Sequence, residues 1–219
     1  MAHQINMHIK PAIITIFIFL LGLMIGIAID NHRVSQVRKT ISESEIRWND
    51  ALLLNQHLEN LGNSSCDLAL EENLKYNNAI YTYGRQIEKI IEATTFTPEL
   101  EQEWTRYNLL QVQFWFNSIE LKERCGFYYH NVVYISREKN TTNGEEVNNK
   151  LQSSVLLDLK EKCGNKIMLI PLTGDVDLIV MDSVIKQFDI IEYPSVIIDE
   201  KYVFQGLTTI EDLENIVKC

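Results

Sequence analysis

The sequence predicts an α+β membrane protein with a spanning helix, a bundle of long helices and a C-terminal α/β domain. Three observations give this fold class. An uncharged apolar run fills residues 12–29. Apolar residues then recur at helical spacing as far as residue 128, and β-rich runs alternate with amphipathic stretches from residue 129 onwards. We therefore expect three parts, at residues 1–29, 30–128 and 129–219.

The amino-acid composition agrees with a folded globular chain and argues against a disordered chain and against a nucleic-acid-binding protein. The 219 residues carry a net charge of −10, 46% of them are hydrophobic and 23% are charged, as is typical of a folded globular chain. Binding of nucleic-acid phosphates needs an excess of lysine and arginine. The acidic balance therefore indicates that the chain does not bind nucleic acid.

Residues 12–29 read AIITIFIFLLGLMIGIAI and predict one spanning helix. At about 1.5 Å per residue, this run covers most of a bilayer's hydrocarbon core. A cleaved signal peptide, with Gly26 and Ala28 before the cut, is the alternative, although the run exceeds the usual apolar core of about 7–15 residues. Gly22 and Gly26 form a small-xxx-small pair that would allow a homo-oligomer, but glycine is also common in spanning helices.

Three helices are expected between residues 30 and 128. The first continues from the span to about residue 61, and the second covers about 65–93. The third begins with Thr97 as N-cap and Pro98 at its first position, and it ends before Gly126. This third helix carries two apolar stripes and is therefore expected to be buried on two sides. The first stripe consists of Leu100, Trp104, Tyr107, Leu110, Phe114 and Leu121, and the second consists of Leu109, Val112, Phe116 and Ile119.

The C-terminal part has the order βαβαββα, which predicts a mixed sheet flanked by helices. Strands are expected at residues 131–136, 166–172, 194–199 and 201–204, and helices at residues 145–162, 178–188 and 210–217.

This order, together with the segment DIIEYPSVIID at residues 189–199, resembles the thioredoxin superfamily over roughly residues 131–219. The resemblance implies that Pro194 is the cis-proline that opens the third strand beside the active-site loop. Redox-active members carry Cys-x-x-Cys just after the first strand, and by spacing Lys139 and Thr142 occupy those positions here. Since neither residue exchanges a disulfide, the resemblance implies a redox-inactive member.

In that family the surface around the cis-proline accepts extended peptide through main-chain hydrogen bonds, a form of strand addition. The resemblance therefore singles out Tyr193, Pro194 and the 137–144 loop as a peptide-binding surface. We find no P-loop, Gly-x-Ser-x-Gly, His-Glu-x-x-His or glycine-rich dinucleotide motif, and no histidine pair at ligand spacing. Asp175 and Asp177 fit a solvated turn. We therefore expect no catalytic residue, cofactor or metal.

The four cysteines form no Cys-x-x-Cys pair. Cys66 begins the second helix and Cys125 ends the third, so a disulfide would join one end of an antiparallel hairpin, with two unpaired buried cysteines as the alternative. The thioredoxin resemblance brings the helices that end at Cys163 and Cys219 to one edge, where a second bridge or a frayed Cys219 is expected.

Two features of the sequence disagree about the side of the membrane on which the C-terminal part lies. Lys10 precedes the span, whereas Arg33, Arg38 and Lys39 follow it, so the cation count alone places the bulk of the chain in the cytoplasm. Paired cysteines favour an oxidising compartment, and we follow them in expecting an extracytoplasmic C-terminal part. Glycosylation triplets begin at Asn63 and Asn140.

Together these features predict a single-pass, redox-inactive protein that binds or scaffolds a protein partner or an extended peptide. An oxidoreductase that uses Cys163 with Cys219, and a structural subunit of a membrane complex, are the alternatives.

Overall fold

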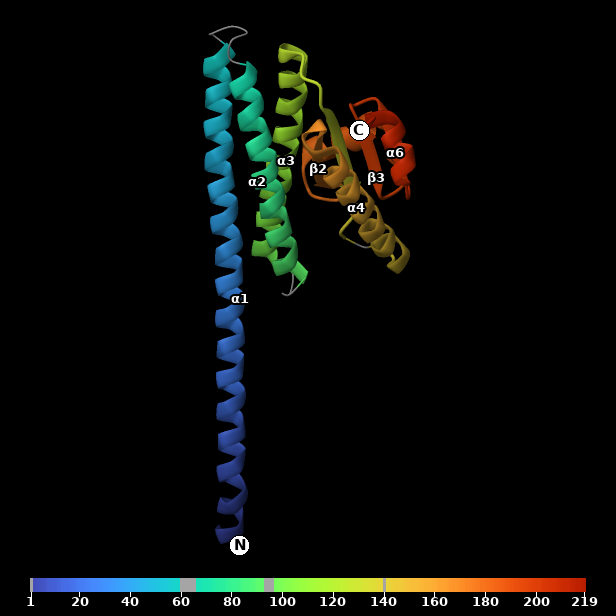
Figure 1. The fold of residues 1–219 in the computed structure, drawn as a ribbon. Coiled ribbons are helices and arrows are strands. Elements are labelled where there is room, and N and C mark those ends of the chain that lie inside the picture. Colours follow the sequence, from blue (N-terminus) through green and yellow to red (C-terminus); the bar gives the residue numbers. More distant parts are fainter. Residues whose placement is uncertain (1, 60–65, 93–96, 140) are drawn as a thin grey trace.

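The computed structural model describes residues 2–59, 66–92, 97–139 and 141–219. The chain is of the mixed α+β class, with three long helices followed by a small sheet and its flanking helices (Figure 1). In chain order the elements are α1 (Ala2–Glu59), α2 (Cys66–Glu92), α3 (Pro98–Cys125), β1 (His130–Ser136), α4 (Asn143–Cys163), the 3-10 turn η2 (Gly164–Lys166), β2 (Ile167–Thr173), α5 (Ile179–Gln187), β3 (Ser195–Ile198), β4 (Tyr202–Gln205) and α6 (Ile210–Val217).

The N-terminal half of α1 stands apart from the rest of the chain (Figure 1). Its large apolar side chains between Ile13 and Ile29 are 39–67% exposed, so they bury little surface within the chain. By length and composition, α1 contains a segment able to cross a membrane, near the N-terminus. Two expectations fall outside the described residues. They are the helix ends at residues 61–63 and 94–96, and the glycosylation asparagines Asn63 and Asn140.

The C-terminal half of α1 packs with α2 and α3. Val37, Ile41 and Trp48 of α1 are at most 2% exposed, as the apolar spacing requires. At the centre of the bundle the Trp48 and Tyr76 rings lie 4.9 Å apart, and the Tyr76 and Phe114 rings lie 5.6 Å apart. Such tilted aromatic pairs add to the energy of area burial.

Helix α3 begins and ends as the sequence predicts. The Thr97 side chain accepts a hydrogen bond from the Leu100 N–H, and Gly126 closes the helix in the left-handed conformation with φ of 67°. The expectation of two buried stripes is wrong for part of the second stripe, because Leu109 and Phe116 are 39% and 46% exposed. The second contact of α3 is made instead through Trp115, which is 1% exposed.

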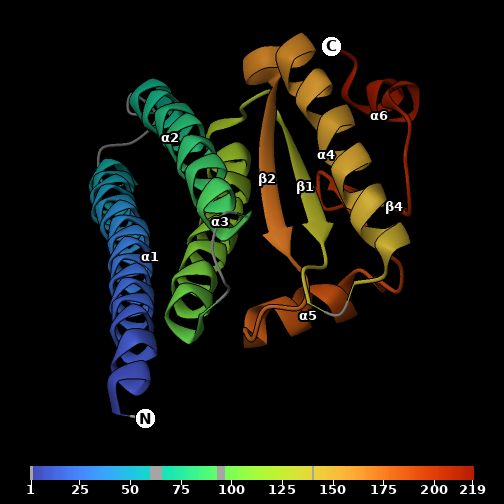
Figure 2. The same ribbon diagram turned by 90° about the horizontal axis from the view of Figure 1, so that it is seen from below.

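The four strands form one mixed sheet in the order β2-β1-β3-β4. Strand β1 is parallel to β2 and antiparallel to β3, and β4 is antiparallel to β3. One face of the sheet packs on the helical bundle, so that α3 lies between the sheet and α1 (Figure 2). The other face packs on α4 and α6 through a second core, which contains Val132, Leu156, Leu159, Val196, Leu213 and Val217.

Candidate functional site

The candidate site lies where β1 ends and β3 begins. The Tyr193–Pro194 peptide bond is cis. Because β1 and β3 are antiparallel, with Ile135 opposite Ser195, the start of β3 lies beside the end of β1. The Pro194 carbonyl accepts a hydrogen bond from the Gly206 N–H at 2.8 Å. Among the hydrogen bonds of the described residues, none uses the main-chain N–H or C=O of Tyr193.

The Tyr193 ring is contacted by Gly174 and by Arg137. A Cβ atom added to Gly174 would lie 2.6 Å from Cε1 of Tyr193 and 3.1 Å from Ile135, so glycine is required for this close packing. The Arg137 guanidinium stacks over the ring at 4.5 Å from its centroid. Tyr193 is only 8% exposed, and Pro194 is also buried. Both side chains, which the sequence analysis expects at a peptide-binding surface, are thus buried.

Glu138 and Lys139, which follow β1, are held by hydrogen bonds on both sides. The main-chain N–H groups of Glu138 and Lys139 donate to the two carboxylate oxygens of Asp175, at 3.0 and 2.6 Å. The Lys139 ammonium pairs with Glu101 in the first turn of α3, and this hydrogen bond raises the pKa of Lys139. Asp175, expected only as a solvated turn residue, therefore orders the loop.

Thr142 has a structural role at the start of α4. Its hydroxyl accepts from the Glu145 N–H at 3.2 Å, and the Glu145 carboxylate accepts from the Thr142 N–H at 2.8 Å. This reciprocal pair is a capping box. The hydrogen bond from the Thr142 main chain lowers the pKa of Glu145. Lys139 and Thr142, the positions where the thioredoxin resemblance expects cysteines, thus carry an ion pair and a helix cap.

All four cysteines are placed in pairs at disulfide distance. The Cα atoms of Cys66 and Cys125 are 5.7 Å apart, and those of Cys163 and Cys219 are 5.1 Å apart. Cys163 ends α4, whereas Thr142 caps its start, so α4 separates the second pair from the loop by about 30 Å. Neither pair adjoins Pro194.

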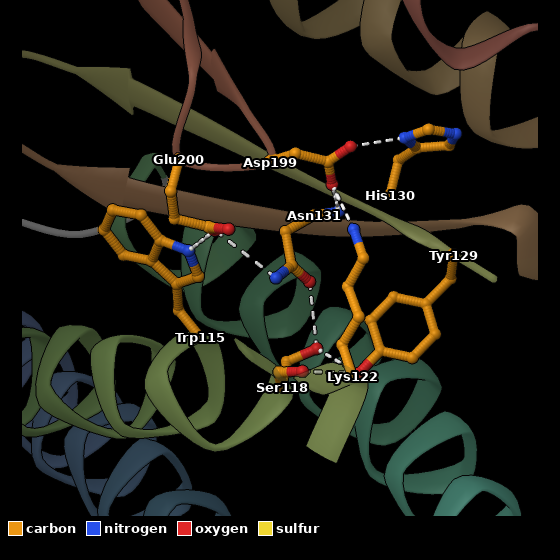
Figure 3. Close-up of polar contacts among 8 residues, drawn as sticks. All are labelled: Trp115, Ser118, Lys122, Tyr129, His130, Asn131, Asp199 and Glu200. Atoms are coloured by element: carbon orange, nitrogen blue, oxygen red, sulfur yellow. Dashed lines mark hydrogen bonds and ion pairs between the residues drawn. The ribbon is translucent and has the colours of Figure 1, made fainter. Parts of the chain in front are cut away.

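A second polar cluster joins α3 to the turn between β3 and β4 (Figure 3). Asp199 and Glu200 form this turn with φ of 51° and 56°, a left-handed conformation that disfavours residues other than glycine. The Asp199 carboxylate accepts from Lys122 at 2.7 Å and from the Asn131 N–H at 3.0 Å, and it contacts Nδ1 of His130 at 2.5 Å.

Glu200 completes the cluster. Its carboxylate accepts from the Trp115 indole N–H at 2.5 Å and from the Asn131 amide at 3.3 Å (Figure 3). Burial raises the pKa of Glu200, which indicates a largely desolvated carboxyl. Burial also raises the pKa of Asp199, but hydrogen bonds from Lys122 and His130 outweigh it and hold that pKa below its usual value. Sequence reasoning missed this cluster, whose one signal was an Asp-Glu pair between two strands.

The contacts of the cluster connect α3 with the sheet. Its carboxylates are directed at donors from the same chain, and no group of three His, Cys, Asp or Glu side chains among the described residues is arranged to hold a metal ion. Its evident role is to fasten the sheet to α3. Comparison with protein-family models, with curated proteins and with solved structures finds no match to this chain.

Proposed function

We propose that this protein is a membrane-anchored, redox-inactive, thioredoxin-like module that binds extended peptide segments of other proteins. The observation that carries the proposal is the cis Tyr193–Pro194 bond at the start of β3, beside a loop that holds Lys139 and Thr142 in place of cysteines. The order β1, α4, β2, α5, β3, β4, α6 supports the family assignment. The apolar segment of α1 is the proposed anchor.

The main chain of Tyr193 supplies the binding chemistry. Its N–H and C=O have no hydrogen-bond partner among the described residues, and the side chain beneath them is fixed against Gly174. An extended peptide would therefore gain main-chain hydrogen bonds without a rearrangement of the Tyr193 main chain. Arg137 lies at the edge of this surface and would have to swing outward to admit the peptide.

The proposed orientation is extracytoplasmic because both cysteine pairs are at disulfide distance, and such bonds persist in oxidising compartments. The oxidoreductase alternative is disfavoured because exchange needs a reactive thiol beside the surface that binds the substrate. Here Cys163 lies at the far end of α4. A role as a structural subunit is a second candidate, favoured by Ile46 and Leu53, two exposed apolar side chains one heptad apart on α1.

A peptide panel tests the proposal. We expect the full chain in lipid nanodiscs to bind a subset of extended peptides, and Gly174→Ala to weaken that binding at least tenfold because the added methyl displaces Tyr193. Gly22→Ala is the matched control, since it lies in α1 away from this surface and its Cβ would meet nothing within 4 Å. Equal binding by both variants, with circular dichroism showing both folded, would exclude this surface as the peptide site.

A redox assay separates the oxidoreductase alternative. We expect no reduction of insulin by the full chain with dithiothreitol above the rate of dithiothreitol alone. A chain carrying Lys139→Cys and Thr142→Cys provides the comparison at the positions beside the cis-proline. Activity of the unmodified chain that disappears in Cys163→Ala would establish the alternative.

A further inference from the structure

The structure fixes the height of the candidate surface above the apolar segment of α1. Helix α1 runs without interruption from Ala2 to Glu59, so Arg38 stands about 14 Å beyond Ile29. Nε of Arg38 donates to Oε1 of Glu103 at 3.0 Å, and that carboxylate is 3% exposed. This ion pair places Glu103, near the start of α3, beside Arg38 of α1.

Helices α1 and α3 run in the same direction. Arg38 pairs with Glu103, and one to two turns further on Glu45 pairs with Arg106. Residues of α3 that precede Glu103 therefore lie closer to the proposed membrane than Arg38 does. Glu101 is one of them, and it pairs with Lys139 of the loop after β1. The loop thus lies roughly 10 Å beyond Ile29, whereas the headgroup layer on each side of the hydrocarbon core is about 5–8 Å thick.

The candidate surface also lies at the end of the sheet nearer to the proposed membrane. Strand β1 starts next to the C-terminal end of α3 and ends at the loop that meets the first turn of α3, so it descends toward the N-terminal part of α1 (Figure 1). Tyr193 lies at this lower end of the sheet, beside the end of β1. Two apolar side chains at the same end, Ile179 and Ile191, are 90% and 82% exposed.

We propose that the bound segment is the extended juxtamembrane segment of a second membrane protein, held at the bilayer surface. This inference rests on the proposed function and adds the class of partner. The gap of roughly 10 Å leaves little room for a folded soluble domain, whereas a chain that leaves the bilayer covers that distance in about three extended residues. Exposed Ile179 and Ile191 provide apolar contacts for the residues next to a span.

The test changes the distance between the candidate surface and the bilayer and leaves the residues of that surface unchanged. Eleven helix-forming residues inserted between Asn31 and His32 raise the bundle by about 16 Å and preserve its facing, since eleven residues make close to three turns. The same insertion between Asn6 and Met7 lengthens α1 on the other side of the span and serves as the control. Both chains, and the unmodified chain, are reconstituted in nanodiscs with the photoreactive substitution Ile191→benzoylphenylalanine.

Two probes contain the same peptide sequence, which is the tightest binder in the peptide panel that tests the proposed function. One is the free peptide, and the other is a leucine-rich span followed directly by the segment. We expect the unmodified and control chains to cross-link to the spanning probe, and the raised chain to lose at least tenfold in yield. Cross-linking to the free peptide should be equal in all three chains.

Each result decides the inference. Equal cross-linking of the spanning probe to the raised and unmodified chains would overturn it. Cross-linking to lipid alone, unaffected by either probe, would show that the bilayer itself covers the surface and would also overturn it. Failure of the free peptide to bind any chain would instead contradict the proposed function, which separates the two claims.

Discussion

At the scale of single residues, buried polar contacts decide how the sheet meets the helices. Asp199 is the centre of this arrangement because it accepts from Lys122 and from the Asn131 main chain and contacts His130. These contacts also hold a turn whose two left-handed residues lack the freedom of glycine. Without them, the turn would lose the electrostatic partners of Asp199 and would keep only the Glu200–Trp115 hydrogen bond to α3.

We predict that Asp199→Asn lowers the free energy of unfolding by about 1–3 kcal/mol at pH 7. The sign with pH follows from a pKa held below the usual 3.8. The contribution is fully present above pH 3.8 and is lost as pH falls through the lower pKa of the folded state. Denaturant titrations of both chains from pH 7 to pH 2 should therefore show a difference that is constant down to about pH 4 and shrinks below it. A difference that grows on acidification would refute this account.

At the scale of elements, the sequence predicts the helices and strands well because their signals are local. Periodicity places each C-terminal strand and helix within a residue or two of its observed bounds, and Thr97 and Gly126 mark the ends of α3. What local patterns do not reveal is which neighbour a side chain meets. Trp115 was missed because its partner, Glu200, is 85 residues away. The burial of Tyr193 was missed because it depends on Gly174 and Arg137.

The start of α4 offers a test at this scale. We predict that Thr142→Ala lowers the free energy of unfolding by about 0.5–2 kcal/mol, because the first turn loses its capping oxygen. Thr141→Ala, at the neighbouring hydroxyl outside the capping box, is the control and should change stability by no more than about 0.5 kcal/mol. Thermal melts followed by circular dichroism measure both, and equal melting temperatures would show that the cap contributes nothing.

The hairpin of α2 and α3 is closed by its cysteine pair. Replacing both Cys66 and Cys125 with alanine should lower the free energy of unfolding by about 2–4 kcal/mol, because the unfolded chain regains the freedom of a loop with a separation of 59 residues. Peptide mapping without reductant should find the two residues linked. Free, alkylatable thiols at both positions in the native chain would contradict the pairing.

At the scale of the whole molecule, the parts predicted as residues 30–128 and 129–219 share a core. Val133 and Ile170 of the sheet belong to the same apolar cluster as Val37 of α1 and Phe114 of α3. A shift of α1 would therefore be passed to the sheet through α3. Because the core is continuous, the position of the proposed anchor sets the distance and orientation of the candidate surface relative to the membrane.

The orientation of the whole molecule is testable in cells. With an extracytoplasmic C-terminal part that stays joined to its anchor, protease added to right-side-out cells should digest the C-terminal region. An antibody tag after Cys219 reports the loss, and a cytoplasmic marker protein confirms that the cells are intact. Protection of the tag until lysis would reverse the proposed orientation and would remove the compartment argument for the disulfides.

The central claim is that the main chain of Tyr193 binds an extended peptide, and amide hydrogen exchange tests it most directly. The Tyr193 N–H has no hydrogen-bond partner among the described residues, so its exchange should slow at least tenfold when the best peptide of the panel saturates the full chain in nanodiscs. The Tyr202 N–H, on β4, should be unaffected. Unchanged exchange at Tyr193 under saturating peptide would contradict the account.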